Sequence, residues 1–170
     1  MRVADVLLED FDTEIANTRR TLERVPEDQP QYKPHEKSTP LGRLAMHCAT
    51  LPLFGFYVLS DEDMDLQSPR HPRAAMDFTS RAECLRQLES SAAQCRAALA
   101  AASDAQMAAD WPFRFGPQVI SQTSRTRTYR QMFFNHLVHH TSQLGVYLRL
   151  LGVPVPALYG PSADEQWTAR

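Results

Sequence analysis

The amino-acid sequence predicts an all-α fold, a four-helix bundle formed by residues 1–170 as a single domain. Three observations support this prediction. Four segments repeat apolar residues at helical spacing, the segments between them are polar or rich in proline, and 170 residues are enough to bury one core. A content of 43% hydrophobic and 22% charged residues is ordinary for a globular domain. We therefore expect four helices packed around a common core.

The first helix is predicted to run from Val3 to Val25, where Pro26 ends it. Its stripe consists of Leu7, Phe11, Ile15, Thr18, Leu22 and Val25. Asp10 and Glu14 flank this stripe, and acids in that position are usually its solvated border. The alternative is that these two carboxylates reach a central site and accept hydrogen bonds from the side chains that form it.

The second helix is predicted to start at Thr39 and Pro40, with the threonine hydroxyl as cap and proline at the first helical position. Its apolar stripe contains Leu44, Leu51, Phe54 and Val58. His47 lies within about 60° of these residues at 100° per residue, so it belongs to the core face. Pro52 should bend the helix about one turn beyond this histidine.

Two long connections are polar. Residues 27–38 should run over the surface with Tyr32 as their anchor. Residues 61–78 are long for a bundle connection and suit a crossover or a partial lid, with His71 expected at the surface. The tail after the last helix is predicted to pack over one end of the bundle through Leu158, Tyr159 and Trp167.

A capping box at Ser80 and Glu83 predicts the start of the third helix. Farther along, residues 114–115 and 119–120 can pair across the Gly116-Pro117 turn as a small hairpin. The alternative for this stretch is an irregular covering loop. The prediction therefore includes a short hairpin or irregular loop before the fourth helix.

The fourth helix is predicted from Gln131 to Leu151, ending at Gly152. Its apolar stripe contains Phe133, Leu137, Leu144 and Tyr147. His140 lies within this stripe and His136, four residues earlier, lies about 40° to one side, so both should point inward. His139 lies about 100° away and should not.

Two inward imidazoles need partners for their nitrogen atoms. A metal ion is one such partner, because histidines four residues apart on a helix are a common source of two nitrogen ligands. Hydrogen bonds to buried carbonyl or hydroxyl groups are the alternative. Since His47 also faces the core, we expect His47, His136 and His140 to converge in the interior of the bundle.

Charge and composition narrow the possible functions. A formal net charge of -2 gives no support for a nucleic-acid surface, which normally shows a basic excess. No run of about 18 apolar residues is present, and the acidic N-terminal segment does not resemble a signal peptide. We therefore expect a cytoplasmic protein without membrane or nucleic-acid partners, in which Cys48, Cys84 and Cys95 are reduced and mostly buried.

The segments LGRLAMHCATLP, with His47, and NHLVHHTSQLGVYLRLLGVPVPALYGPSADE, with His136 and His140, together resemble the DinB-like family of proposed metalloenzymes. The resemblance also includes TRRTLERVPEDQPQYKPHEKSTPLG near the N-terminus. It implies an up-down-down-up four-helix bundle, often dimeric, with a divalent metal such as nickel or zinc held by a histidine triad. Family members commonly have Arg-Gly where this chain has Thr141-Ser142.

These features predict a metal-dependent enzyme that acts on a small molecule. Three neutral histidine ligands leave an open coordination position, as in catalytic sites, where the ion can activate a bound water for hydrolysis or hold a thiol as thiolate. The family resemblance adds transfer dependent on a low-molecular-weight thiol. The alternative is a non-catalytic bundle in which a metal or a histidine cluster stabilises the fold or a dimer. The sequence identifies no general base, and Gln143 and Tyr147 are only near the expected face.

Overall fold

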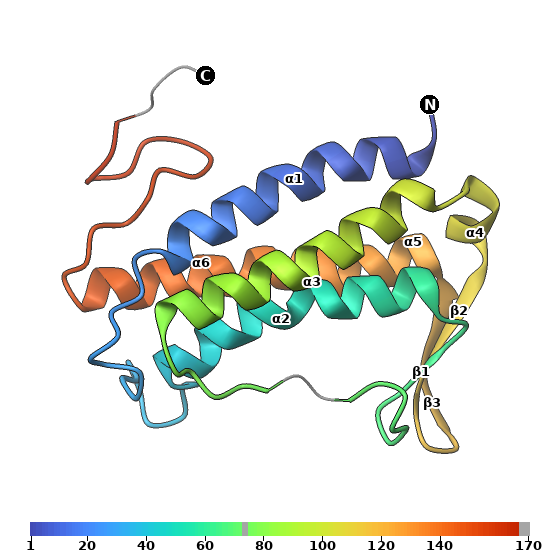
Figure 1. Ribbon diagram of the computed structural model, residues 1–170, viewed down its shortest axis with the longest axis horizontal. Coiled ribbons are helices and arrows are strands. Elements are labelled where there is room, and N and C mark those ends of the chain that lie inside the picture. Colours follow the sequence, from blue (N-terminus) through green and yellow to red (C-terminus); the bar gives the residue numbers. More distant parts are fainter. Residues whose placement is uncertain (73–74, 167–170) are drawn as a thin grey trace.

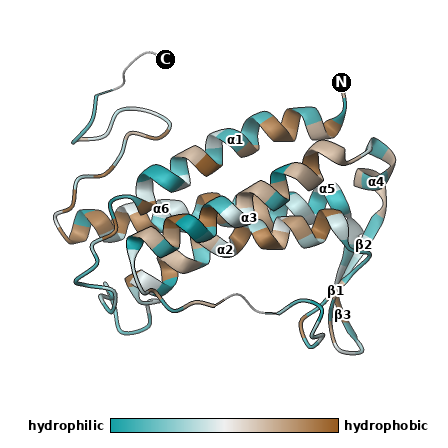
Figure 2. Ribbon diagram, viewed as in Figure 1, coloured by the Kyte–Doolittle hydropathy of each residue, from teal (hydrophilic) through white to brown (hydrophobic). Residues whose placement is uncertain are grey.

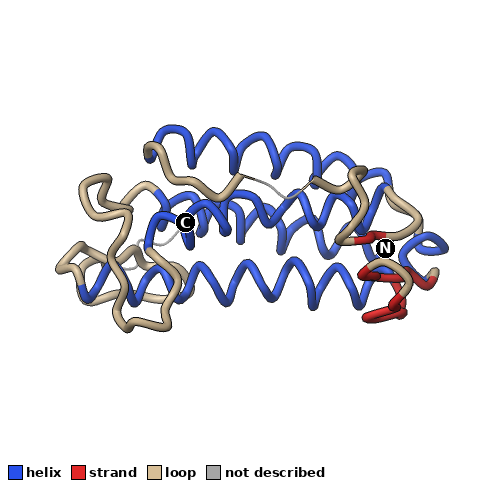
Figure 3. Tube along the Cα trace, turned by 90° about the horizontal axis from the view of Figure 1, so that it is seen from below, coloured by secondary structure: helices blue, strands red, loops and turns tan. Residues whose placement is uncertain are grey.

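A computed structural model describes residues 1–72 and 75–166 and shows a mostly helical fold with a small sheet at one end (Figures 1 and 3). The long helices are α1 (Val3–Leu22), α2 (Leu41–Ser60), α3 (Arg81–Ala101) and α6 (Asn135–Leu150). In Figure 1, α1 and α6 run in one direction, while α2 and α3 run in the other. The fold is mostly helical, as predicted, but it also contains a small three-stranded sheet, of which only the hairpin was predicted.

Helix α2 is the most enclosed of these helices. Thirteen of its twenty residues are buried, as expected for a helix whose residues are mostly hydrophobic (Figure 2). At Gly55, an added Cβ would lie 2.7 Å from Phe133 Cδ1 and 2.8 Å from Cys95 Sγ. The absence of a side chain at this position therefore lets α2 approach α3 and the helix that precedes α6.

Helix α2 starts differently from the prediction. Pro40 is the N-cap residue and has no side-chain cap hydrogen bond, and the helix begins at Leu41. The carbonyl group of Thr39 instead accepts a hydrogen bond of 2.9 Å from the Tyr147 hydroxyl. The Tyr147 ring also packs edge-on against Tyr32, which confirms Tyr32 as the anchor of its loop.

A three-stranded sheet closes one end of the molecule. Strands β2 (Asp110–Phe115) and β3 (Gln118–Ser124) form the antiparallel hairpin predicted across Gly116-Pro117, with Arg114 opposite Val119. Strand β1 (Met64–Asp65) pairs with β2 in parallel. The sequence did not predict β1, because a two-residue strand has no periodicity and depends on a partner distant in the chain. The short helix α4 (Asp104–Ala108) was also not predicted.

The fourth predicted helix is longer and less regular than expected. It begins as α5 (Arg125–Thr128), continues as a π-helical segment, η1 (Tyr129–Phe134), and becomes α6. Helix α6 ends at Leu150, close to the predicted position. Gly152, just beyond it, has a left-handed backbone conformation. The π-helical segment matters for the site because it directly precedes His136.

Helix α3 begins at the predicted Ser80, whose hydroxyl accepts a hydrogen bond from the Glu83 backbone amide. The chain after α6 returns along α1 and contacts it mainly through polar groups, whereas the prediction was apolar packing over one end of the bundle; Tyr159 is 61% exposed. Its Ala157 carbonyl accepts a hydrogen bond from Arg20, and Glu165 forms ion pairs with Arg20 and Arg24. The prediction for Trp167 falls outside the described residues.

Candidate metal centre

Three histidines meet between α2 and α6. His47 comes from α2, while His136 and His140 come from successive turns of α6. Their ring centroids lie 4.6–5.0 Å apart, and one nitrogen from each ring can be chosen so that all three lie within 4.8 Å of one another. The predicted convergence of these side chains is therefore what the structure shows.

The spacing of the nitrogen atoms suits a small cation. The Nε2 atoms of His47 and His136 lie 3.4 Å apart. Two nitrogen ligands at the usual distance of about 2.0–2.1 Å from a tetrahedral zinc ion lie roughly 3.3 Å from each other. The pair therefore needs little rearrangement to share an ion.

The outer nitrogen atoms of the two α6 histidines are already engaged. His136 Nδ1 donates to the Met132 carbonyl oxygen at 3.2 Å, and His140 Nδ1 donates to Gln143 Oε1 at 2.7 Å. Because these acceptors hold the hydrogen on Nδ1, each Nε2 atom keeps its lone pair for a ligand. Such partners are typical of metal-binding histidines. Gln143 thus forms a hydrogen bond with His140, whereas the sequence indicated only that it lies near this face.

Burial favours the neutral form of two of the three histidines. Burial, together with the neighbouring His140, His136 and Arg43, lowers the pKa of His47 to about 4. Burial also lowers the pKa of His140, although its hydrogen bond with Gln143 opposes this effect. Neutral imidazoles are the form that binds metal ions. Within the described part of the chain, the cluster contains neither a carboxylate nor a thiolate.

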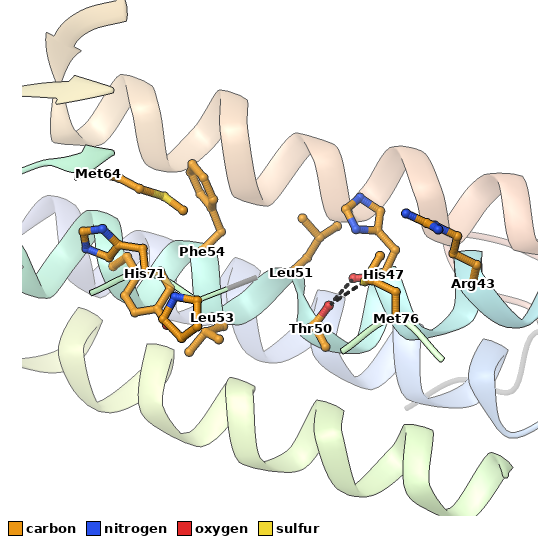
Figure 4. A pocket seen from close by; sticks show the side chains of 11 residues that line it. Arg43, His47, Thr50, Leu51, Leu53, Phe54, Met64, His71 and Met76 are labelled. Atoms are coloured by element: carbon orange, nitrogen blue, oxygen red, sulfur yellow. Dashed lines mark hydrogen bonds between the residues drawn. The ribbon is translucent and has the colours of Figure 1, made fainter. Parts of the chain in front are cut away.

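A cavity of about 270 Å³ adjoins the cluster at His47 (Figure 4). Most of its lining is apolar, including Leu51, Phe54 and Met64, and Arg43 lies near its His47 end. His71 borders the cavity away from His47. A cavity of this kind can hold a small, mainly apolar molecule beside the three histidines.

The prediction that His71 lies at the surface is wrong. The residue is 2% exposed, and its Nε2 atom lies 2.7 Å from Asp61 Oδ2. Its ring also packs edge-on against Tyr57. Flanking prolines and a neighbouring arginine suggested an exposed loop, but pairing of β1 with β2 brings this connection against α2. No periodic signal in the sequence could have found this contact.

Other predicted residues are not members of the cluster, although the His139 ring packs edge-on against His140 with centroids 4.9 Å apart. His139 is exposed, as predicted. Glu14 is buried, contrary to its expected place at a solvated border, and accepts a hydrogen bond of 2.5 Å from Tyr159. Thr141 shares a buried hydrogen bond with Thr18 and so links α6 to α1.

The three cysteines are free and buried, as predicted. Burial raises the pKa of both Cys84 and Cys95 to about 12 and raises that of Cys48 as well. They are therefore protonated core residues and are poor nucleophiles.

A model of the DinB superfamily matches residues 10–144, most of the chain. The protein therefore belongs to the DinB superfamily, which confirms the resemblance seen in the sequence. In the described residues, none of the helices combines the length and apolar character needed to cross a membrane.

Solved structures show the same fold. A DinB-like protein from Bacillus cereus ATCC 10987 is 16% identical with a TM-score of 0.64, and the match covers 89% of this chain and 95% of that chain. A DinB-like protein from Bacillus subtilis is 18% identical with a TM-score of 0.67, covering 94% and 98%. A search of functionally curated proteins gives no match.

Proposed function

We propose that this protein is a metal-dependent enzyme for a small molecule, in which His47, His136 and His140 hold a divalent ion, with zinc or nickel as the leading candidates. The observation that carries the proposal is the convergence of three histidine side chains, two of which have their outer nitrogens fixed by acceptors. Burial lowers the pKa of His47 and His140, which favours the neutral ligand form. The proposal treats the chain as one domain with the up-down-down-up bundle of its family.

Each part of the site has a separate task. Met132 and Gln143 orient the two α6 histidines, and the apolar cavity beside His47 would exclude water from a bound substrate. A divalent ion would supply a Lewis acid that lowers the pKa of a bound water or thiol. This chemistry supports hydrolysis or transfer dependent on a low-molecular-weight thiol.

Metal content is the first test. Untagged protein purified without chelator should contain about one equivalent of a divalent metal per chain, measured by elemental analysis. His47→Ala and His136→Ala should contain almost none, whereas the matched control His139→Ala should retain it because His139 is exposed. Equal metal content in all four proteins would contradict the proposal.

A structural role is the second candidate. The histidines come from two helices, so a bound ion would cross-link α2 to α6. Thermal unfolding with and without chelator, together with hydrolase and thiol-transfer assays, separates the two roles. Strong destabilisation by chelator without turnover of any substrate would favour the structural role.

We also propose a homodimer. Val146 and Leu150 lie four residues apart on α6 and are 59% and 57% exposed, which gives an apolar strip on the outer face of this helix. Light scattering during gel filtration should give twice the mass of the chain. Val146→Lys should shift the protein to the monomer, and an unchanged mass would place the interface elsewhere.

A further inference from the structure

The cavity beside the three-histidine cluster follows one face of α2. Arg43, His47, Leu51 and Phe54 all border it, and they lie three or four residues apart, so they form one line along the helix (Figure 4). The step from His47 to Phe54 covers about 10 Å at 1.5 Å per residue. The space is therefore elongated, with a cationic side chain before His47 and apolar side chains beyond it.

The guanidinium group of Arg43 has no partner among the residues that the structure describes. Elsewhere on the surface, the exposed Arg96 donates two hydrogen bonds to the carboxylate of Asp12. No ion pair of this kind joins Arg43 to any described residue. Its side chain is exposed and extends toward the His47 ring, one helical turn away (Figure 4). The positive charge is therefore accessible to a ligand that enters beside His47.

The charges around the cavity favour an anion. None of the described residues that line it is an aspartate or a glutamate, and the three-histidine cluster also contains no carboxylate. Arg43 and a divalent ion at His47 would repel each other, because both are positive and one helical turn separates the two residues. A ligand with a negative group near His47 would be attracted by both charges and would reduce that repulsion.

The remainder of the cavity suits an apolar chain. Leu51, Phe54 and Met64 line it beyond His47, and its volume is about 270 Å³. That volume accommodates roughly nine water-sized groups at ~30 Å³ each. An extended eight-carbon chain is also about as long as the ~10 Å from His47 to Phe54 along the helix axis. The cavity therefore matches a ligand with one anionic end and one extended apolar chain.

We propose that Arg43 is a specificity-determining residue that binds the carboxylate of a substrate whose apolar chain lies in the cavity toward Phe54. The substrate class is a small monocarboxylate with a chain of about eight carbons. Its reacting bond is close to the carboxylate, because that end lies beside His47. This inference rests on the proposed function in taking the cavity as the substrate pocket.

A pair of isosteric probes tests the inference on the full chain after metal removal. Octanoate carries a negative charge, whereas octanamide has the same chain and a neutral head group of similar shape. Binding measured by NMR titration at low ionic strength should favour octanoate about fivefold in the wild-type protein, because weak screening strengthens an exposed ion pair. In Arg43→Gln the preference should fall to about one. Arg127→Gln is the matched control and should keep the preference, since Arg127 is exposed and does not border the cavity.

A second measurement does not depend on any variant. Octanoate should move the ¹⁵N resonance of Arg43 Nε in the wild-type protein, and octanamide should not. A wild-type preference near one, a preference that persists in Arg43→Gln, or its loss in Arg127→Gln would overturn the inference. If Arg43→Gln fails to fold, the wild-type resonance decides, and an unmoved Nε signal would overturn it.

The position of the chain is tested in the wild-type protein. Octanoate should bind at least about tenfold more tightly than butanoate, because its additional methylene groups enter the apolar part of the cavity. It should also move the methyl resonances of Leu51 and Met64 and leave that of Leu150, on the outer face of α6, unchanged. Equal affinity for the two acids, or unmoved Leu51 and Met64 signals, would overturn the assignment of the cavity to the chain.

Metal content separates this inference from the proposed function. A protein that prefers octanoate through Arg43 but binds no metal would keep the Arg43 site and contradict the proposed metal centre. A protein that binds metal but shows no preference would keep the metal centre and contradict the role of Arg43. The two results are independent because the probe measurements use metal-free protein.

Discussion

The two histidine groups that border the cavity have opposite electrostatic environments. At one end, His47 faces two further imidazoles, and burial lowers its pKa. At the other end, His71 is hydrogen-bonded to the carboxylate of Asp61. The three-histidine cluster offers nitrogen lone pairs and contains no carboxylate among the described residues. His71, in contrast, already has Asp61 as the partner of one ring nitrogen.

This difference separates the proposed tasks of the two groups. Three neutral imidazoles would leave the charge of a bound cation available for chemistry. An imidazole hydrogen-bonded to a carboxylate has a fixed tautomer, and at His71 this ring is buried. Variants at one end should therefore change metal binding, while variants at the other end should change stability.

The largest expected effect is on metal affinity. His140→Ala removes a proposed ligand and should weaken zinc binding by more than about a hundredfold, since loss of an outer partner alone typically weakens it 10–100-fold. His139→Ala is the matched control because this neighbour is exposed. Competition titration with a zinc indicator measures both. Similar affinities for the two variants would show that His140 is not a ligand.

Gln143 should have the next largest effect. Gln143→Ala removes the acceptor at 2.7 Å from His140 Nδ1 and should weaken zinc binding about 10–100-fold. Gln143→Glu retains an acceptor and should bind zinc at least as well as the wild-type protein. The same indicator titration applies. An unchanged affinity in Gln143→Ala would mean that His140 needs no such partner.

At the other end of the cavity, Asp61→Ala should affect stability and leave zinc affinity unchanged. It leaves both nitrogen atoms of the buried His71 ring without a side-chain partner, which should lower the free energy of unfolding by about 1–2 kcal/mol. Urea unfolding of metal-free protein measures this change. A loss of zinc affinity comparable to that of His140→Ala would break the distinction between the two groups.

The smallest expected effect concerns acid stability. The pKa of His47 is about 4 in the folded protein and near 6.5 in the unfolded chain. The unfolded chain therefore binds a proton that the folded protein does not, and stability falls as the pH drops from about 6.5 to 4. In metal-free His47→Gln this loss should be smaller by about 1 kcal/mol, allowing for solvent screening of a partly exposed ring.

Urea unfolding at pH 7 and pH 4.5 provides the comparison. His35→Gln is the control, because His35 is an exposed loop residue. Its loss of stability in acid should match that of the wild-type protein. The same acid loss in His47→Gln as in the wild-type protein would contradict the lowered pKa of His47.

Helical periodicity explains why the three-histidine cluster could be predicted from the sequence. His47, His136 and His140 each lie in phase with apolar neighbours, and the helices carry that phase directly into space. The same reasoning located the long helices and the position of Gly152. The hairpin was predicted from local turn chemistry at Gly116-Pro117.

His71 shows where this reasoning stops. Its connection has no periodic pattern, and its burial depends on contacts with Asp61 and Tyr57, which precede it by 10 and 14 residues, and on pairing of β1 with the distant β2. Glu14 shows the same limit on α1. Its carboxylate is buried because Tyr159 of the returning chain reaches it, which helical phase on α1 alone cannot reveal.

The π-helical segment has a consequence for how this chain tolerates length changes. Removing one residue between 129 and 134 would restore regular α winding with little change in rotational phase, because a π turn holds about one residue more than an α turn. His136 and His140 would keep their mutual spacing, and Arg125 would stay near the carbonyl oxygens of Val58 and Asp61 that it now binds. The same deletion within α6 would instead turn the flanking segments by about 100° relative to each other.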